Sequence, residues 1–185
     1  MEKTAAGLTV EDCKRLIRDI PDFPTKGVIF KDITPLLGNG ACFRETVDRI
    51  ASLCFRHGLK PDILACPEAR GFIFGAALAY RLGVGFVPIR KPKKLPFRTC
   101  HVQYALEYGK DTVEMHIDAI QPGQSVVLVD DLLATGGTTA ACAELVESIG
   151  ARVSGCVFLV ELDFLKGRER LAKSPVFSLI HYGEA

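Results

Sequence analysis

The sequence predicts an α/β protein in which helices flank a mostly parallel central sheet. Short continuous apolar runs, typical of strands buried on both faces, alternate with longer segments whose apolar residues recur every three or four positions. This alternation is typical of a parallel sheet built from strand–helix–strand units. The chain has 185 residues, of which 48% are hydrophobic and 24% charged. That is about one domain in length and enough for a sizeable core, so we expect a single domain over residues 1–185.

Helices are expected in four places. The first begins after Thr9, because Asp12 three residues later completes a helix-start pattern, and its apolar face continues to Ile20 before Pro21 stops it. The other three have apolar residues in line at three- and four-residue spacing. They span residues 41–56, 71–82 and 138–149.

Buried strands are expected between and after these helices. They cover residues 63–66, 85–89, 125–129, 153–160 and 176–180. Residues 91–121 interrupt the alternation, and within them Val113, Met115 and Ile117 alternate with other residues, which predicts an exposed hairpin. We interpret this interruption as a flexible flap over a ligand site rather than as a second domain.

The overall charge argues against a large polyanion as partner. Lys and Arg number 23 and Asp and Glu 22, so the net charge is +1 and attraction of the whole chain to nucleic acid or to an acidic membrane is not expected. The positive charge is nevertheless concentrated, because residues 69–106 contain seven Lys and Arg and no Asp or Glu. This distribution is compatible with a small polyanionic substrate.

The cysteines and the N-terminus bear on the cellular compartment. The seven cysteines include no Cys-x-x-Cys pair, so neither a zinc site nor a disulfide framework is indicated, and a reducing compartment is expected. The N-terminal residues lack the apolar core of a signal peptide. Residues 71–89 are apolar enough to suggest a membrane span, but Arg81, Gly83 and Pro88 interrupt them. We therefore expect a cytoplasmic protein without a membrane segment.

The most informative stretch is residues 126–139, VVLVDDLLATGGTT. A buried strand ends in Asp130 and Asp131, a turn with two glycines follows, and a helix begins. Ligands of open α/β sheets bind outside the carboxyl ends of the strands, where glycine N–H groups and a helix N-terminus can surround an anion. The stretch therefore predicts a phosphate loop. Hydroxyl donors in it are Thr135, Thr138 and Thr139.

The two carboxylates suit a different part of the same ligand. They would repel a phosphate, whereas they can accept hydrogen bonds from hydroxyl groups or share a divalent cation with the ligand. A sugar phosphate meets both demands, with its phosphate on the loop and its diol on Asp130 and Asp131. The alternative is a turn in which both aspartates only cap neighbouring amides. Neither G-x-x-x-x-G-K-S/T nor G-x-G-x-x-G occurs in the chain, which excludes two other phosphate-binding loops.

Residues 126–139 resemble the motif with which type I phosphoribosyltransferases bind phosphoribosyl pyrophosphate (PRPP). LLATGGT resembles the adenine branch of that family more than the orotate or hypoxanthine branches. Other blocks resemble the same enzymes in the same order: PDFPTKGVIFKDIT, EARGFIFG, GFVPIRKPKKLP, LEYGKD and LVELDFLKGRERL. The resemblance covers nearly the whole chain, and it implies the family fold with a small N-terminal hood at residues 1–35 and a flexible loop at 91–121.

The resemblance also implies a reaction. It is that of a purine-salvage glycosyltransferase (a pentosyltransferase), which transfers the ribosyl 5-phosphate of PRPP to adenine and gives AMP and pyrophosphate. It implies Mg²⁺ held mainly by substrate oxygens and water, with Asp131 as the candidate protein ligand, and a homodimer. Two alternatives stay open: a phosphoribosyltransferase for another purine, and a non-catalytic regulator on the same fold that senses PRPP or a purine. Retention of Arg70 and Glu107 favours an enzyme.

Most of the site residues that the resemblance implies lie at the ends of predicted strands. Asp130 and Asp131 would hold the ribose hydroxyls. The 5′-phosphate would be wrapped by Ala134, Thr135, Gly136, Gly137 and Thr138, and the pyrophosphate would be held by Glu68, Ala69, Arg70, Arg90, Lys91 and Lys94.

The resemblance and the sequence say more about three basic residues of this region. Arg70 would also be catalytic, because its planar donors can grip two phosphate oxygens. In relatives, the arginine equivalent to Arg90 can reach into a neighbouring subunit's site. Lys93 stands where glycine is frequent in the family. A solvated basic surface is the alternative interpretation of this cluster.

The base and the lid complete the expected site. Glu107 would exchange a proton with the N7 side of the purine as N9 becomes nucleophilic, and Tyr108 would help to close the lid. Phe30 would stack on adenine, while backbone groups of Ile29 and Lys31 would read its edge. The alternative for Ile29 and Phe30 is an ordinary place in the core.

Overall fold

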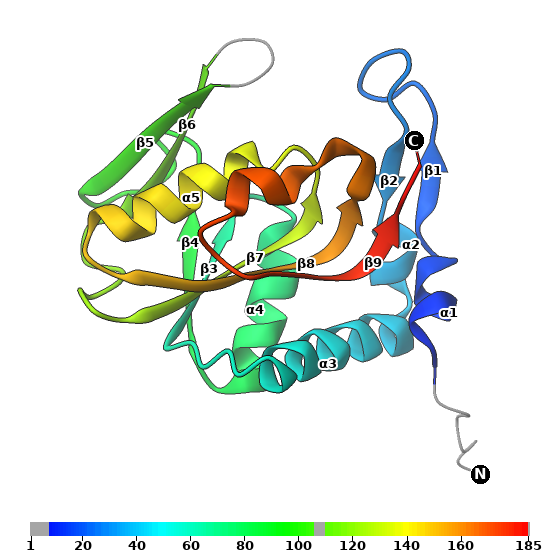
Figure 1. The fold of residues 1–185 in the computed structure, drawn as a ribbon, viewed down its shortest axis with the longest axis horizontal. Coiled ribbons are helices and arrows are strands. Elements are labelled where there is room, and N and C mark those ends of the chain that lie inside the picture. Colours follow the sequence, from blue (N-terminus) through cyan, green and yellow to red (C-terminus); the bar gives the residue numbers. More distant parts are fainter. Residues whose placement is uncertain (1–7, 106–109, 185) are drawn as a thin grey trace.

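The computed structural model describes residues 8–105 and 110–184, and it is built around a five-stranded parallel sheet (Figure 1). The strand order is β4-β3-β7-β8-β9, and each neighbouring pair is parallel. The strands are β3 (Ile63–Pro67), β4 (Gly85–Ile89), β7 (Ser125–Leu133), β8 (Arg152–Leu162) and β9 (Val176–Tyr182). The predicted fold class is confirmed. β7 runs beyond its predicted end, so Asp130 and Asp131 lie within this strand.

Helices cover both faces of the sheet. Helices α3 (Gly40–Arg56) and α4 (Gly71–Leu82) lie on one face and α5 (Gly137–Ser148) on the other (Figure 1). Successive residues of a strand point to opposite faces. Accordingly Leu64 packs in the core under α3 and α4, whereas Ala65 packs in the core under α5. The bounds of α4 match the prediction, since Gly83 adopts the left-handed conformation (φ 69°) that ends the helix.

The predicted hairpin is formed by β5 (Thr99–Ala105) and β6 (Lys110–His116), which pair antiparallel. An exposed hairpin was expected, but one face of this hairpin is buried. Val102, Val113 and Met115 are buried, in the same core cluster as residues of α5. The alternating pattern was therefore that of a half-buried strand, with one face on a helix.

The N-terminal segment differs most from its prediction. Thr9 and Asp12 cap each other reciprocally as expected, but α1 (Val10–Lys14) stops six residues early. Residues 18–20 instead form β1 (Arg18–Ile20), which pairs antiparallel with β2 (Phe30–Asp32). Arg18 Nη2 lies 2.6 Å from Asp32 Oδ2 across this pair. A partner strand that lies distant in sequence thus outweighs a weak helical periodicity.

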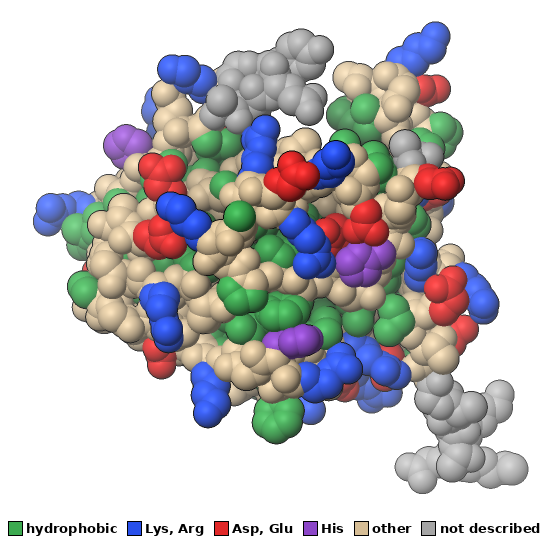
Figure 2. Space-filling view, in the orientation of Figure 1, with side chains coloured by type: hydrophobic (Ala, Val, Ile, Leu, Met, Phe, Trp, Pro, Cys, Tyr) green, Lys and Arg blue, Asp and Glu red, His purple; other side chains and the backbone are tan. Residues whose placement is uncertain are grey.

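Three short helices complete the description. They are α2 (Thr34–Gly38) and the 3₁₀ turns η1 (Asp163–Leu165) and η2 (Gly167–Leu171). Basic and acidic side chains are interspersed on the face shown in Figure 2. None of the helices in the described ranges is both long and apolar enough to cross a membrane.

Candidate active site

The predicted phosphate loop connects the carboxyl end of β7 to the start of α5. Gly136 has φ +77°, a conformation that side-chain-bearing residues rarely adopt, and a Cβ there would collide with the carbonyl oxygen of Gly167. α5 begins one residue later, at Gly137. Residues 134–138 therefore lie at a helix N-terminus with the loop backbone free of side chains at its centre, as an anion site requires.

Asp131 is almost fully buried, and its carboxylate faces the loop that follows β3. Asp131 Oδ2 lies 3.0 Å from Nε of Arg70, the residue that precedes α4. The ends of β3 and β7 are brought together because the two strands are neighbours in the sheet. The structure therefore joins a predicted pyrophosphate residue to a predicted ribose residue.

Asp130 lies against the first residue of α4. A Cβ on Gly71 would stand 2.9 Å from Asp130 Oδ1, closer than real Cβ contacts allow, so Gly71 is required for this approach. The same Oδ1 accepts a hydrogen bond of 2.8 Å from the backbone N–H of Asp131. Sequence reasoning identified Gly71 as a helix start and missed this second role.

Burial disfavours the ionised form of both carboxylates. Burial raises the pKa of Asp130 well above its usual value, and the charge of Asp131 raises it further. Burial also raises the pKa of Asp131, although the Arg70 guanidinium acts in the opposite direction. Hydroxyl donors or a divalent cation would supply the compensation that these groups lack.

Glu68 lies among the predicted pyrophosphate cations. It directly follows β3, and its carboxylate accepts hydrogen bonds of 2.6 Å from Arg90 Nε and from Lys94 Nζ. Burial raises the pKa of Glu68, but the bonds from Lys94 and Arg90 together outweigh burial and leave the pKa below its usual value. Arg90 is thus paired within its own chain, and three predicted residues form one cluster. The peptide bond between Glu68 and Ala69 is cis.

Lys91 points to the hairpin instead of to this cluster. Its Nζ donates to Asp111 Oδ2 and lies 3.4 Å from the hydroxyl of Tyr104. That hydroxyl donates to Asp111 Oδ2 (3.2 Å) and also lies 3.2 Å from Oγ1 of Thr138 in the phosphate loop. Sequence reasoning missed Tyr104 and Asp111 as members of the site. These two residues meet because β5 pairs with β6 in a register that places Tyr104 opposite Asp111.

Phe30, which the resemblance implies would stack on the base, packs against Arg70 and Phe23. The Arg70 guanidinium carbon stands 4.9 Å from the centre of its ring, and the Phe23 ring meets it edge-on at 5.1 Å. Ile29 is 39% exposed, so it is not a core residue. The Lys31 side chain is buried and bonded to Asp19 at 2.7 Å, which leaves only its backbone for reading a base.

Two predicted site residues, Glu107 and Tyr108, lie outside the described residues. The ends of β5 and β6 that flank them are described, and these belong to the hairpin that carries Tyr104 and Asp111.

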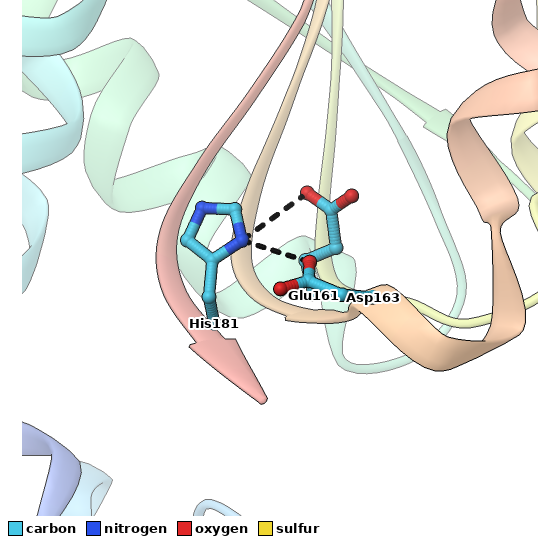
Figure 3. Close-up of side chains that lie close together, drawn as sticks. All are labelled: Glu161, Asp163 and His181. Carbon is cyan, nitrogen blue, oxygen red and sulfur yellow. Dashed lines mark hydrogen bonds and ion pairs between the residues drawn. The ribbon is translucent and has the colours of Figure 1, made fainter. Parts of the chain in front are cut away.

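One further polar group lies at the carboxyl ends of β8 and β9. It consists of Glu161, Asp163 and His181, and Figure 3 shows that the His181 ring faces both carboxylates. His181 Nδ1 lies 2.9 Å from Asp163 Oδ1 and 3.9 Å from Glu161 Oε2. Both oxygens of Glu161 already accept hydrogen bonds from Arg168, so the group is an ion-pair network rather than a set of free metal ligands.

Known proteins have the same fold and belong to one family. The family model of the phosphoribosyl transferase domain matches residues 38–181. An adenine phosphoribosyltransferase of Dichelobacter nodosus is 56% identical over 169 residues, which are 91% of this chain and 97% of that protein.

Solved structures show the same relationship. The crystal structure of adenine phosphoribosyltransferase from Thermoanaerobacter pseudethanolicus is 55% identical, covers 94% of this chain and 100% of that one, and has a TM-score of 0.91. The Saccharomyces cerevisiae enzyme, complexed with an imino-altritol bisphosphate and adenine, is 42% identical over 92% of this chain and 97% of its own, with a TM-score of 0.87. The chain therefore belongs to the phosphoribosyltransferase family, in its adenine phosphoribosyltransferase branch.

Proposed function

We propose that the carboxyl ends of β3, β4 and β7 form the site at which this chain transfers ribosyl 5-phosphate from PRPP to adenine. The observation that carries the proposal is the contact of Arg70 with both Asp131 and Phe30. One guanidinium thus joins the places expected for pyrophosphate, ribose and base. The phosphate loop lies at the end of the same strand as Asp131.

The reaction exchanges one bond at the anomeric carbon of the ribose. The bond to the pyrophosphate oxygen breaks, adenine N9 forms the new bond, and the proton that adenine gives up leaves through Glu107 on the N7 side. The leaving pyrophosphate gains negative charge, which the nearby Arg70, Arg90 and Lys94 would neutralise. Catalysis of this kind depends on positioning and charge stabilisation.

The donor set also fits Mg²⁺. Asp130 and Asp131 are adjacent carboxylates whose burial disfavours their charge, and a hard divalent cation prefers such oxygen ligands. Asp131 would hold the ion together with water and substrate oxygens. When bound, the ion would neutralise part of the charge of the pyrophosphate.

The Lys91 side chain is already held by Asp111 and Tyr104. Its proposed role with pyrophosphate therefore requires the hairpin to release it. Closure of the flap at residues 91–121 would both release Lys91 and exclude water, which otherwise hydrolyses PRPP.

We also propose a cytoplasmic homodimer. The cysteines in the described residues are free thiols, and six of the seven are buried, which suits a reducing compartment. The oligomeric state is measured by sedimentation equilibrium, and a mass of one 20.2 kDa chain would contradict the dimer.

The proposed activity is tested with a panel of bases. Formation of AMP is measured from adenine, PRPP and Mg²⁺, with guanine, hypoxanthine, xanthine and orotate as controls. Turnover with adenine alone is expected. Turnover with another base but not adenine would identify a different phosphoribosyltransferase, and PRPP binding without any turnover would identify a regulator.

A further inference from the structure

Glu161 is a buried carboxylate that the proposed reaction does not use. It lies near the carboxyl end of β8 and is 2% exposed. Its Oε1 accepts a 2.6 Å hydrogen bond from Arg168 Nε, and its Oε2 accepts bonds from Arg168 Nη2 (2.7 Å) and from the Ser178 hydroxyl (2.5 Å). A carboxylate satisfied in this way fixes the position of its guanidinium partner.

Arg168 belongs to η2, the turn that follows β8. Its Nη1 donates a 2.7 Å hydrogen bond to the carbonyl oxygen of Val176 at the start of β9. The side chain therefore ties η2 to two strands of the central sheet.

The first residue of η2 lies directly on the predicted phosphate loop. A Cβ on Gly136 would collide with the Gly167 carbonyl oxygen and stand 3.2 Å from the Gly167 carbonyl carbon. A Cβ on Gly167 would in turn collide with the Ala134 carbonyl oxygen and stand 2.8 Å from Leu133 Cδ1. The two backbones approach so closely that a shift of η2 would displace the loop.

A second contact comes from the last part of the same turn. Arg170 Nη1 stands 3.2 Å from the position that a Cβ of Gly137 would take, at the first residue of α5. η2 therefore contacts the loop both at its centre and where the helix begins.

We propose that Glu161 and Arg168 are positioning residues for the phosphate loop, acting through the contact between Gly167 and Gly136. The pair holds η2 against the sheet, and η2 holds the backbone of residues 134–137 in the shape that receives the 5′-phosphate. This inference rests on the proposed function, because it assumes that the loop binds the phosphate of PRPP.

The test compares two variants at Arg168 with a control in the core. Arg168→Lys keeps the charge but cannot form the two parallel bonds, and Arg168→Met removes the charge. The control is Ile50→Val, which removes one methyl group from a buried side chain of α3. Each protein is measured for melting temperature, for ribose 5-phosphate affinity by calorimetry, and for kcat and both KM values.

Both Arg168 variants are expected to weaken ribose 5-phosphate binding and to raise KM for PRPP by about tenfold, while KM for adenine changes by less than about twofold. The control should lower the melting temperature without raising KM for PRPP. Gly167→Ala is a third variant that pushes directly on the Ala134 carbonyl, and it should show the same selective loss even if an Arg168 variant fails to fold.

Unchanged ribose 5-phosphate affinity in Arg168→Lys and Gly167→Ala would overturn the inference. So would an equal rise of both KM values, because that pattern indicates general destabilisation. Failure of the proposed function is a separate result, since the unmodified protein would then show no AMP formation in the panel of bases.

Discussion

Arg70 forms an ion pair with Asp131, whereas the neighbouring Asp130 makes no ion pair within the described residues. Arg70 Nε lies 3.0 Å from Asp131 Oδ2, whereas Asp130 Oδ1 accepts a hydrogen bond of 2.8 Å from a backbone N–H. The pKa of Asp130 is raised by burial and then by the charge of Asp131. The site therefore holds one carboxylate that Arg70 compensates in part and one that lowers the stability of the ligand-free protein.

Replacement of Asp130 by Asn should stabilise the ligand-free protein and weaken ribose 5-phosphate binding. Asn keeps an oxygen that can accept the Asp131 N–H, and it removes the buried charge, so the free energy of unfolding at pH 7 should rise by about 1 kcal/mol. Thermal unfolding and calorimetric titration with ribose 5-phosphate measure the two effects.

The raised pKa of Asp130 determines how the stabilising effect of Asp130→Asn should change with pH. A folded-state pKa above the unfolded value means that the ionised carboxylate costs stability at neutral pH, and that this cost disappears as the pH falls and the folded group takes up its proton. The advantage of Asp130→Asn should therefore shrink from pH 7 towards pH 4. A variant less stable than the unmodified protein at pH 7 would contradict this account.

Lys93 is the second position at which a substitution should increase the stability of the folded protein. Lys93 has φ +66°, a backbone conformation that suits glycine and strains a lysine. A left-handed residue costs about 1–2 kcal/mol, and the extra freedom of glycine in the unfolded chain offsets part of the gain. Lys93→Gly should therefore stabilise the protein by about 0.5 kcal/mol.

Lys93→Ala is the matched control for this effect, because alanine removes the same side chain and keeps the strained backbone. Urea unfolding of both variants distinguishes strain from charge. If alanine stabilises as much as glycine, the backbone conformation is not the cause.

The sheet was predictable from sequence because burial on both faces leaves continuous apolar runs. All five strands and helices α3, α4 and α5 were found within a few residues of their observed bounds. β1 was not, because residues 16–20 have apolar positions compatible with a helix, and only the partner strand at residues 30–32 decides their conformation.

The candidate site could be assembled from the sequence only where its residues are consecutive. The phosphate loop and Asp130–Asp131 form one motif, whereas Tyr104 and Asp111 reach the site through strand pairing, and Glu161 reaches the loop through Arg168 and Gly167. Contacts of this kind depend on residues far apart in the sequence, and a single sequence carries no periodic signal for them.

Tyr104 should couple the hairpin to the phosphate loop. Its hydroxyl lies 3.2 Å from both Asp111 Oδ2 and Thr138 Oγ1, so Tyr104→Phe should cost about 1 kcal/mol of stability. Combination with Thr138→Ala gives a double-mutant cycle in urea unfolding, and a coupling energy of about 0.5 kcal/mol or more is expected. Strictly additive effects would show that the two hydroxyls do not interact.

Glu107 should act on the base and not on PRPP. If it exchanges a proton on the N7 side of adenine during the reaction, Glu107→Ala should lower kcat by about 10²–10³-fold and leave KM for PRPP nearly unchanged. Glu107→Gln separates the roles, because the amide keeps the size and a hydrogen-bond acceptor but cannot take a proton at neutral pH. Equal losses in both variants therefore indicate proton transfer, whereas a mild effect of Gln indicates hydrogen bonding alone. Glu147→Ala, at an exposed position of α5, serves as the control for removal of one acidic charge. A kcat for Glu107→Ala equal to that of this control would remove Glu107 from the mechanism.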